Sequence, residues 1–201
     1  MSATATLPIP AASSRLMTAD EFAEFVERDE NESRQFELVR GEVIERSRPT
    51  LLHGTVVMAI GIRFGLYAES IGKGNVVTES GILLEQEPDT VRGPDVAFFD
   101  DVKRIEDVED GWSTIPPLVA VEVRSPGEST RNLLSKVDEY LDFGVKLVWL
   151  VDYEEKFITV YRKDRKHQTF DEGDTLTCDE LQGFSCAVAN FFRTPGQVPK
   201  S

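Results

Sequence analysis

The feature that most restricts how this chain can fold is a succession of an apolar run, a helical pattern and a second apolar run. Leu118–Val123 and Leu147–Val151 are nearly continuous apolar runs of strand length, which is typical of strands covered on both faces. Between them, residues 129–143 carry apolar side chains at helical spacing, and Gly144 follows as a helix stop. This order predicts a crossover unit with two parallel strands.

Further patterns place strands and helices on both sides of this unit. Thr18 and Glu21 have capping-box spacing and predict a helix over about 18–29. Alternating runs around Arg40-Gly41 predict a hairpin. We also expect a helix over 52–67, strands at 75–78, 81–85 and 94–99, and a hairpin made of 157–162 and 168–170. Together these elements predict an α/β fold, with a mixed β-sheet flanked by helices and with an N-terminal helix and hairpin.

The length of 201 residues fits one or two domains, and no internal repeat or second core is visible. We therefore expect a single domain over 16–194, with a disordered tail at 1–15 and a frayed tail at 195–201. Gly54, Gly61 and Gly65 fall within the predicted helix 52–67. Glycines there suggest that the helix packs closely against a sheet.

Composition and the chain start predict a cytoplasmic protein that does not enter the membrane. No apolar run approaches the ~20 residues needed to cross a bilayer, and residues 1–15 lack the basic start and apolar centre of a signal peptide. Cys178 and Cys186 are too few for a disulfide framework and have no metal-ligand spacing with the two histidines.

The net charge of −14 weighs against tight binding of naked duplex DNA by this chain alone, because phosphate neutralisation supplies much of the affinity of nucleic-acid binders. An acidic total is compatible with a local basic face. The compact basic cluster is Arg162, Lys163, Arg165 and Lys166. It is either a phosphate contact or a hairpin whose charges serve solubility.

Two carboxylates stand out in the strands. Asp95 opens a strand directly after Pro94, and Glu122 interrupts the apolar run 118–123. A carboxylate in a buried strand is costly unless it is paired or bound to a cation. Two of them on adjacent strands can share Mg²⁺, which prefers oxygen ligands. Such a metal would polarise a phosphoryl oxygen and lower the pKa of a bound water, as phosphodiester hydrolysis requires.

Lys136, in the helix that follows, is placed to reach back to the strand end and supply the remaining cation. The same residues also allow a structural interpretation. Asp95 would then be a turn residue after Pro94, and Glu122 would pair with Arg124 or Lys136 in an ion pair. Residue types alone leave both interpretations open.

Three segments resemble one known family: Phe36-Glu-Leu-Val-Arg-Gly-Glu42, Pro94-Asp-Val-Ala-Phe98 and Val121-Glu-Val-Arg-Ser-Pro126. The last is followed by Lys136, Tyr140, Gly144-Val145 and Trp149-Leu-Val-Asp152. Their order and spacing are similar to the Uma-type family of putative restriction endonucleases, within the PD-(D/E)XK nuclease superfamily. The similarity runs from about Thr18 to Phe192 and implies a restriction-endonuclease-like fold.

The resemblance also implies roles for individual residues. Asp95 and Glu122 stand at the positions of the two metal-binding acids. The usual lysine would fall on position 124, which here is Arg124, a poor proton acceptor. Lys136 matches the family's downstream lysine and is expected to be the migrated catalytic lysine. Glu37 is expected to be an additional acid near the metal.

His53 matches a histidine often found at the start of the next helix in this family. An equally good interpretation is a helix-start residue with a local hydrogen bond.

The function predicted from the sequence is a Mg²⁺- or Mn²⁺-dependent endonuclease that hydrolyses phosphodiester bonds in DNA, expected as a homodimer because cutting both strands favours symmetry. The alternative is a catalytically inactive nuclease fold that binds protein or nucleic acid, motivated by the acidic balance and by Arg124. An enzyme acting on a small phosphorylated substrate has little support, since no glycine-rich phosphate loop is present.

Overall fold

The computed structural model describes residues 15–101, 104–108, 110–194 and 196–197, so most of the tails predicted at 1–15 and 195–201 lies outside the described residues. The helices are α1 (Ala19–Val26), α2 (Leu51–Ile71) and α3 (Thr130–Phe143), with short 3₁₀ turns at Ile105–Asp107 and Val188–Phe191. The strands are β1 (Gln35–Val39), β2 (Glu42–Arg46), β3 (Asn75–Val77), β4 (Ile82–Glu85), β5 (Thr90–Arg92), β6 (Val96–Phe99), β7 (Val119–Val123), β8 (Leu147–Asp152), β9 (Phe157–Arg162), β10 (His167–Asp171), β11 (Thr175–Thr177) and β12 (Ser185–Ala187).

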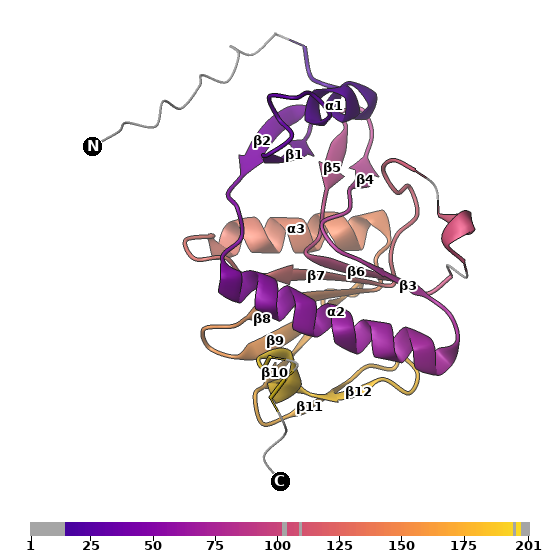
Figure 1. Cartoon of the computed structure of the whole chain (residues 1–201), viewed down its shortest axis with the longest axis vertical. Helices are drawn as coiled ribbons and strands as arrows, with labels where there is room; N and C mark the ends of the chain where they lie inside the picture. Colours follow the sequence, from indigo (N-terminus) through magenta and orange to yellow (C-terminus); the bar gives the residue numbers. More distant parts are fainter. Residues whose placement is uncertain (1–14, 102–103, 109, 195, 198–201) are drawn as a thin grey trace.

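The strands form a six-stranded sheet in the order β10-β9-β8-β7-β6-β3, a four-stranded sheet in the order β2-β1-β5-β4, and the pair β11-β12. Strands β7 and β8 run parallel and are joined through α3, as the sequence predicts, and the other strand pairs are antiparallel. The predicted mixed α/β fold is therefore confirmed. Figure 1 shows α1 with the smaller sheet at one end of the molecule, and α2 and α3 on either side of the larger sheet.

Alternation along β7 divides its side chains between two cores. Val119, Val121 and Val123 join Trp149 in a core that includes α2, whereas Ala120 packs with α3. Glu122 shares the α3 side of the strand by the same alternation. A third core joins α1 to the smaller sheet through residues such as Phe22, Leu38 and Val91.

The helix ends follow local chemistry. Thr18 and Glu21 form the predicted capping box, although α1 ends at Val26, before the predicted end near residue 29. Ser129 caps α3 through its side chain, and Gly144 ends that helix at φ +121°, a backbone conformation that side-chain-bearing residues rarely adopt.

The predicted role of the glycines in α2 is wrong. A Cβ atom added at Gly54, Gly61 or Gly65 would meet no heavy atom within 4 Å, so these glycines do not serve close packing within the chain. The buried side of α2 is made instead by larger residues such as Phe64. By length and composition alone, α2 is apolar enough to cross a membrane, a test that core helices of soluble proteins also pass.

Candidate active site

Strand register places the two predicted acids beside each other. Val96 on β6 pairs with Val121 on antiparallel β7. Asp95 directly precedes β6, which begins at Val96 and not at the predicted residue 94, so it lies at the end of the strand beside Glu122. The Asp95 carboxylate contacts the backbone of β7 and His53 of α2, whereas the Glu122 carboxylate contacts Lys136 and Tyr140 of α3.

The backbone of β7 and a histidine from α2 hold Asp95. Its Oδ2 accepts a hydrogen bond from the Val123 amide at 2.6 Å and lies 3.4 Å from Nε2 of His53. That nitrogen is also 3.1 Å from the Val123 carbonyl oxygen. Because Nε2 faces two acceptors, we assign it the ring proton. Burial disfavours the charged ring, but the hydrogen bond and charge of Asp95 outweigh it and raise the pKa of His53. His53 thus contacts a predicted metal ligand directly.

Glu122 is buried between β7 and α3, with each oxygen bound by a different side chain. Oε2 accepts from Lys136 Nζ at 2.8 Å, and Oε1 accepts from the Tyr140 hydroxyl at 2.8 Å. Lys136 and Tyr140 are one helical turn apart and therefore share a face of α3. Burial raises the pKa of Glu122 to about 7. The charge of Lys136 opposes this shift, and the charges of Asp95 and Glu37 add to it.

Glu37 approaches the same lysine from the smaller sheet. Its Oε1 is 3.5 Å from Lys136 Nζ, and its Oε2 accepts from Arg92 at 2.6 Å. Burial alone would raise the pKa of Glu37, but the charges of Lys136, Arg92 and Arg46 outweigh burial and lower it. The pKa of Lys136 is raised, because Glu122 and Glu37 outweigh its burial. The site therefore holds an ionised glutamate, a charged lysine and a glutamate that titrates near neutral pH.

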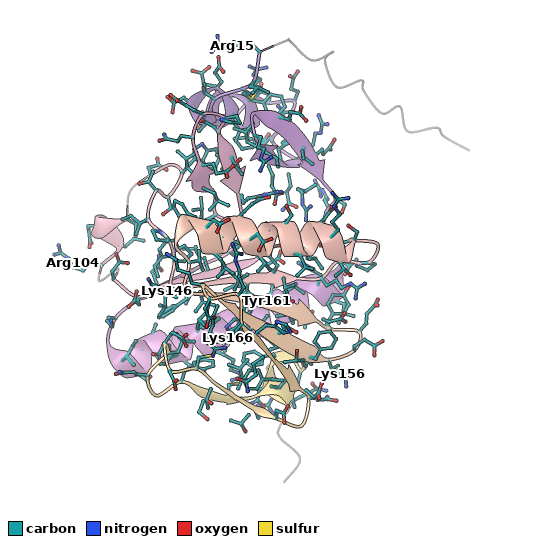
Figure 2. All side chains as sticks on the ribbon, turned by 180° about the vertical axis from the view of Figure 1, so that it is seen from behind. Arg15, Arg104, Lys146, Lys156, Tyr161 and Lys166 are labelled. Atoms are coloured by element: carbon teal, nitrogen blue, oxygen red, sulfur yellow. The ribbon has the colours of Figure 1, made fainter. Side chains whose placement is uncertain are left out.

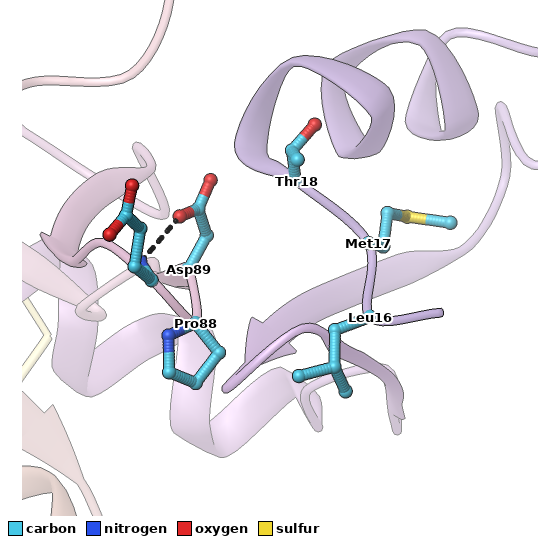
Figure 3. A pocket seen from close by; sticks show the side chains of 6 residues that line it. Leu16, Met17, Thr18, Pro88 and Asp89 are labelled. Atoms are coloured by element: carbon cyan, nitrogen blue, oxygen red, sulfur yellow. Dashed lines mark hydrogen bonds between the residues drawn. The ribbon is translucent and has the colours of Figure 1, made fainter. Parts of the chain in front are cut away.

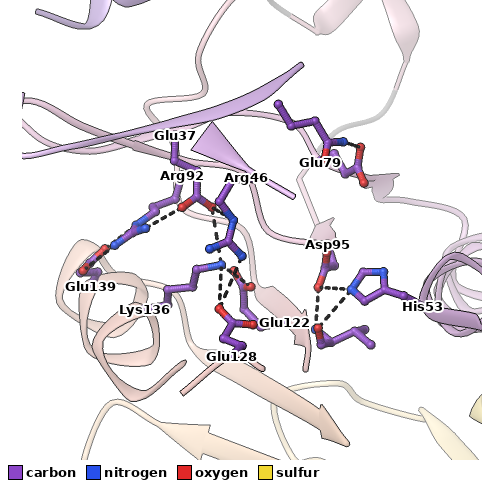
Figure 4. A network of polar contacts seen from close by, with 12 residues as sticks. Glu37, Arg46, His53, Glu79, Arg92, Asp95, Glu122, Glu128, Lys136 and Glu139 are labelled. Carbon is purple, nitrogen blue, oxygen red and sulfur yellow. Dashed lines mark hydrogen bonds and ion pairs between the residues drawn. The ribbon is translucent and has the colours of Figure 1, made fainter. Parts of the chain in front are cut away.

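Arg92 ties the smaller sheet to α3. The register of Leu38 with Val91 places Glu37 directly opposite Arg92 on β5. The guanidinium also donates two hydrogen bonds to Glu139 of α3, at 2.8 and 3.0 Å. Figure 4 shows this network spanning both sheets and α3. A second arginine of the smaller sheet, Arg46, contacts Glu128 at 3.4 Å. These contacts fix the position of Glu37 over the acids of the larger sheet.

Arg124 does not take the place of Lys136. It binds Asp152 at 2.9 Å, and its side chain is 47% exposed. Of the two cations that the sequence offers as partners of Glu122, the structure places Lys136 at that carboxylate. The structure therefore contains the ion pair of the structural interpretation, and it also brings Asp95, Glu122, Lys136 and Glu37 into one cluster.

The basic cluster at the β9–β10 turn is largely paired with acids. Arg165 contacts Asp138 and Asp142 of α3, and Arg162 contacts Glu180 at 3.1 Å. Lys166 pairs with Asp164 at 2.7 Å. These ion pairs offset part of the positive charge of this turn.

The donor set of the cluster fits a hard divalent cation. Asp95 and Glu122 supply carboxylate oxygens, and the Val123 carbonyl lies beside Asp95. Mg²⁺ is commonly held by one or two carboxylates, with water and substrate phosphate completing its coordination. Across the described residues, no three His, Cys, Asp or Glu side chains are arranged to hold a metal ion. Two side chains suffice for Mg²⁺ but would not make a closed structural zinc site.

Sequence reasoning missed Arg92, Arg46, Glu128 and Glu139 as parts of this cluster. Arg92 lies on β5, a strand of three residues that was not predicted. A sequence signal did exist for Tyr140, which is four residues after Lys136 on the predicted helix. No comparable signal exists for the cross-strand partner of Glu37.

A cavity of about 340 Å³ lies away from these acids, between the segment before α1 and the loop before β5. Figure 3 shows Leu16, Met17 and Thr18 on one side of it and Pro88 and Asp89 on the other. Asp89 accepts a hydrogen bond from the Ala19 amide at 2.7 Å, so its carboxylate holds the start of α1. We assign this cavity no chemical role.

Comparison with known proteins agrees with the fold. The family model described as Uma2, putative restriction endonuclease, matches residues 20–189. Among solved structures, the chain is similar to a putative nuclease belonging to DUF820 from Anabaena variabilis ATCC 29413, with a TM-score of 0.72 and 20% identity over 88% of this chain and 97% of that chain. The comparison with curated proteins gave no match. The chain belongs to the Uma2 family of putative restriction endonucleases.

Proposed function

We propose that this protein is a divalent-metal-dependent endonuclease that hydrolyses phosphodiester bonds in DNA. The observation that carries the proposal is that Asp95, just before β6, lies beside Glu122 of β7, with Lys136 bound to Glu122 and Glu37 3.5 Å from that lysine. Family membership supports a nuclease-type function. The metal, the DNA substrate and the residue roles are our own assignments.

In this proposal Asp95 and Glu122 hold the cation, which is Mg²⁺ or Mn²⁺. When bound, such an ion polarises a phosphoryl oxygen and lowers the pKa of a water molecule. Asp95 is suited to face substrate because its side chain is 18% exposed, against 4% for Glu122. The Val123 amide and His53 orient Asp95 from behind.

Lys136 supplies the remaining positive charge. Its ammonium group has three donors, and three carboxylates surround it: Glu122 at 2.8 Å, Glu37 at 3.5 Å and Glu128 at 4.0 Å. We assign the donor that faces Glu128, the longest of the three contacts, to the attacking water or to a phosphate oxygen whose charge grows in the transition state. Glu37 keeps Lys136 protonated and in place, and Arg92 keeps Glu37 ionised and in place.

The first test is cleavage of mixed DNA substrates with Mg²⁺ and with Mn²⁺. We expect metal-dependent cutting in the wild type and a loss of at least about 100-fold in Asp95→Asn and in Glu122→Gln, since each substitution removes a metal-binding charge. Both variants are checked for folding by circular dichroism. Full activity in either folded variant would show that the site is misassigned.

A second outcome would favour the binding-module alternative. That outcome is a folded wild type that cuts no DNA and shows no divalent-metal binding in calorimetry, whereas metal binding that Glu122→Gln abolishes would count against the alternative. We further propose a cytoplasmic location and a symmetric dimer, because two copies related by a twofold axis would present two sites to the two strands. Sedimentation equilibrium tests the dimer.

A further inference from the structure

A second cavity, of about 200 Å³, adjoins the acid pair on the α3 side of the larger sheet. Register explains its position. Glu122 on β7 pairs with Leu150 on β8, which pairs with Thr159 on β9. Glu122, Leu150 and Thr159 therefore form one row across three strands on the same face, and Asp95 lies just beyond the Glu122 end of this row. Glu122 also lines the cavity.

The walls of this cavity suit a flat, uncharged group. Leu133 and Leu134 of α3 and Tyr161 of β9 supply apolar and aromatic surface. Tyr161 is labelled in Figure 2, which views the molecule from behind. The carboxylates of Glu122 and Asp152 also line the space and would repel a phosphate group. The occupant is therefore not the phosphate itself.

The polar groups at one end of the cavity suit the edge of a heterocycle. Arg124, bound to Asp152 at 2.9 Å, offers its other N–H donors, and Asp152 offers the acceptor capacity that remains beside its bonds from Arg124 and from the Glu154 and Glu155 amides. A nucleobase has this combination of apolar faces and a mixed donor and acceptor edge. The volume is below the ~300–1,000 Å³ of pockets for drug-sized ligands, so it suits one base rather than a whole nucleotide.

The distance from the acids also fits a base. Neighbouring strands are about 4.8 Å apart, so the floor at Leu150 and Thr159 lies roughly 5–10 Å from Glu122. A phosphate held at Asp95 and Glu122 would place the base of an adjoining nucleotide within that range.

We propose that this cavity binds one nucleobase of the nucleotide that adjoins the phosphate to be cut. This inference rests on the proposed nuclease function and specifies its substrate. In a duplex the bases are paired and stacked, so only an unpaired or flipped-out base can enter a pocket on the protein. The substrate therefore carries a single-stranded or locally opened nucleotide at the cleavage point.

The test compares a filled cavity with an equivalent surface change elsewhere. Leu134→Trp fills the mouth of the cavity, where Leu134 is 39% exposed. Leu66→Trp makes the same change at a 53% exposed leucine of α2 and serves as the control. Both are made in the Asp95→Asn background to prevent cutting. The probes are a short single-stranded oligonucleotide carrying one 2-aminopurine, scanned along its length, and the same oligonucleotide with an abasic site at each position.

We expect 2-aminopurine fluorescence to change at one position, because stacking in the cavity alters its environment. At that position, the abasic site should lower affinity in the Leu66→Trp protein by roughly 5- to 150-fold, the range for one stacked base. With the intact oligonucleotide, Leu134→Trp should bind more weakly than the Leu66→Trp control by the same factor. With the abasic oligonucleotide, Leu134→Trp should lose no further affinity. Tyr161→Leu, which removes an aromatic surface, provides a second variant in case Leu134→Trp does not fold.

The base site would be overturned if the folded Leu134→Trp and Tyr161→Leu variants bound with the same affinity as the Leu66→Trp control. Failure of the protein to bind any oligonucleotide would also overturn it.

Cleavage assays with Asp95 intact separate the two proposals. If Leu66→Trp cuts DNA and Leu134→Trp cuts it equally well, the nuclease stands and the base site falls. If neither cuts any DNA while base-dependent binding persists, the base site stands and the nuclease falls.

Discussion

The proton affinity of Glu122 determines the pH range in which the acid pair is fully charged. Its pKa is raised to about 7, chiefly by burial, whereas an exposed glutamate has a value of 4.5. In the window between these values the folded protein holds a proton that the unfolded chain has released. Stability therefore falls as pH rises through the window, and the loss is complete above about pH 7. A divalent cation would offset this loss by replacing the proton.

We therefore expect Mg²⁺ to raise the melting temperature more at about pH 8, above the window, than at about pH 5, inside it. Cleavage should rise with pH and level off above about pH 7.

Tyr140→Phe removes a hydrogen bond to the charged form of Glu122, so the midpoint of the pH–rate profile should move up by about one pH unit. Thermal unfolding and a pH–rate profile measure these effects. A Mg²⁺ shift that does not depend on pH would contradict them.

Lys136 and Lys146 provide a matched pair of lysines. Lys136 is buried among acids, whereas Lys146 is exposed just before β8. Lys136→Met should reduce cleavage at least about 100-fold and lower the free energy of unfolding by about 3–5 kcal/mol, since it leaves Glu37 with less compensating charge. Lys146→Met should change neither quantity appreciably. Single-turnover cleavage and urea unfolding make the comparison, and near-wild-type cutting by folded Lys136→Met would remove this residue from the mechanism.

At the scale of secondary-structure elements, α2 contains glycines that its own packing does not require. Gly61 and Gly65 are helical, and a Cβ at either would meet open space. Alanine there should stabilise the protein by about 0.5–1 kcal/mol per site, raising the melting temperature by a few degrees. Gly144→Ala is the contrasting variant and should destabilise, because φ is +121°. If Gly65→Ala destabilises instead, that face of α2 is in contact with another molecule.

Elements with strong local patterns could be predicted from the sequence. The crossover unit was predicted because both apolar runs and the helical spacing are long, and the capping box marks the start of α1. Strand β5 was missed because three residues bounded by Gly93-Pro94 give no readable period. The pairing of Glu37 with Arg92 was missed for a related reason: the register between β1 and β5 joins residues far apart in the chain.

The site was predicted only in part for the same reason. Asp95 and Glu122 stood out because carboxylates in apolar strands need a cation or a partner. Tyr140 matched the family pattern and was otherwise only one residue of an apolar helix face. The structure shows that its hydroxyl also binds Glu122. Helical periodicity identifies the face of a side chain but not the atom that its polar end contacts.

At the scale of the whole molecule, the charge distribution predicts how DNA is bound. The net charge is −14, and Arg162, Arg165 and Lys166 at the β9–β10 turn are paired with acids. These three cations are therefore less available to displace the counterions of a duplex. Proteins that neutralise six to ten phosphates lose about 10³–10⁵ in affinity between 50 and 200 mM salt.

For this protein we expect a much shallower dependence, corresponding to about three phosphates or fewer, and a duplex affinity no tighter than the ~10⁻⁴–10⁻⁶ M of non-specific binders. Fluorescence anisotropy with the non-cleaving Asp95→Asn variant across that salt range measures both quantities. A single-stranded oligonucleotide should bind more tightly than its duplex, because base contacts add affinity that is less sensitive to salt. A steep salt dependence with tight duplex binding would instead reveal a basic surface created by assembly, since the turn that carries the basic cluster is already paired within one chain.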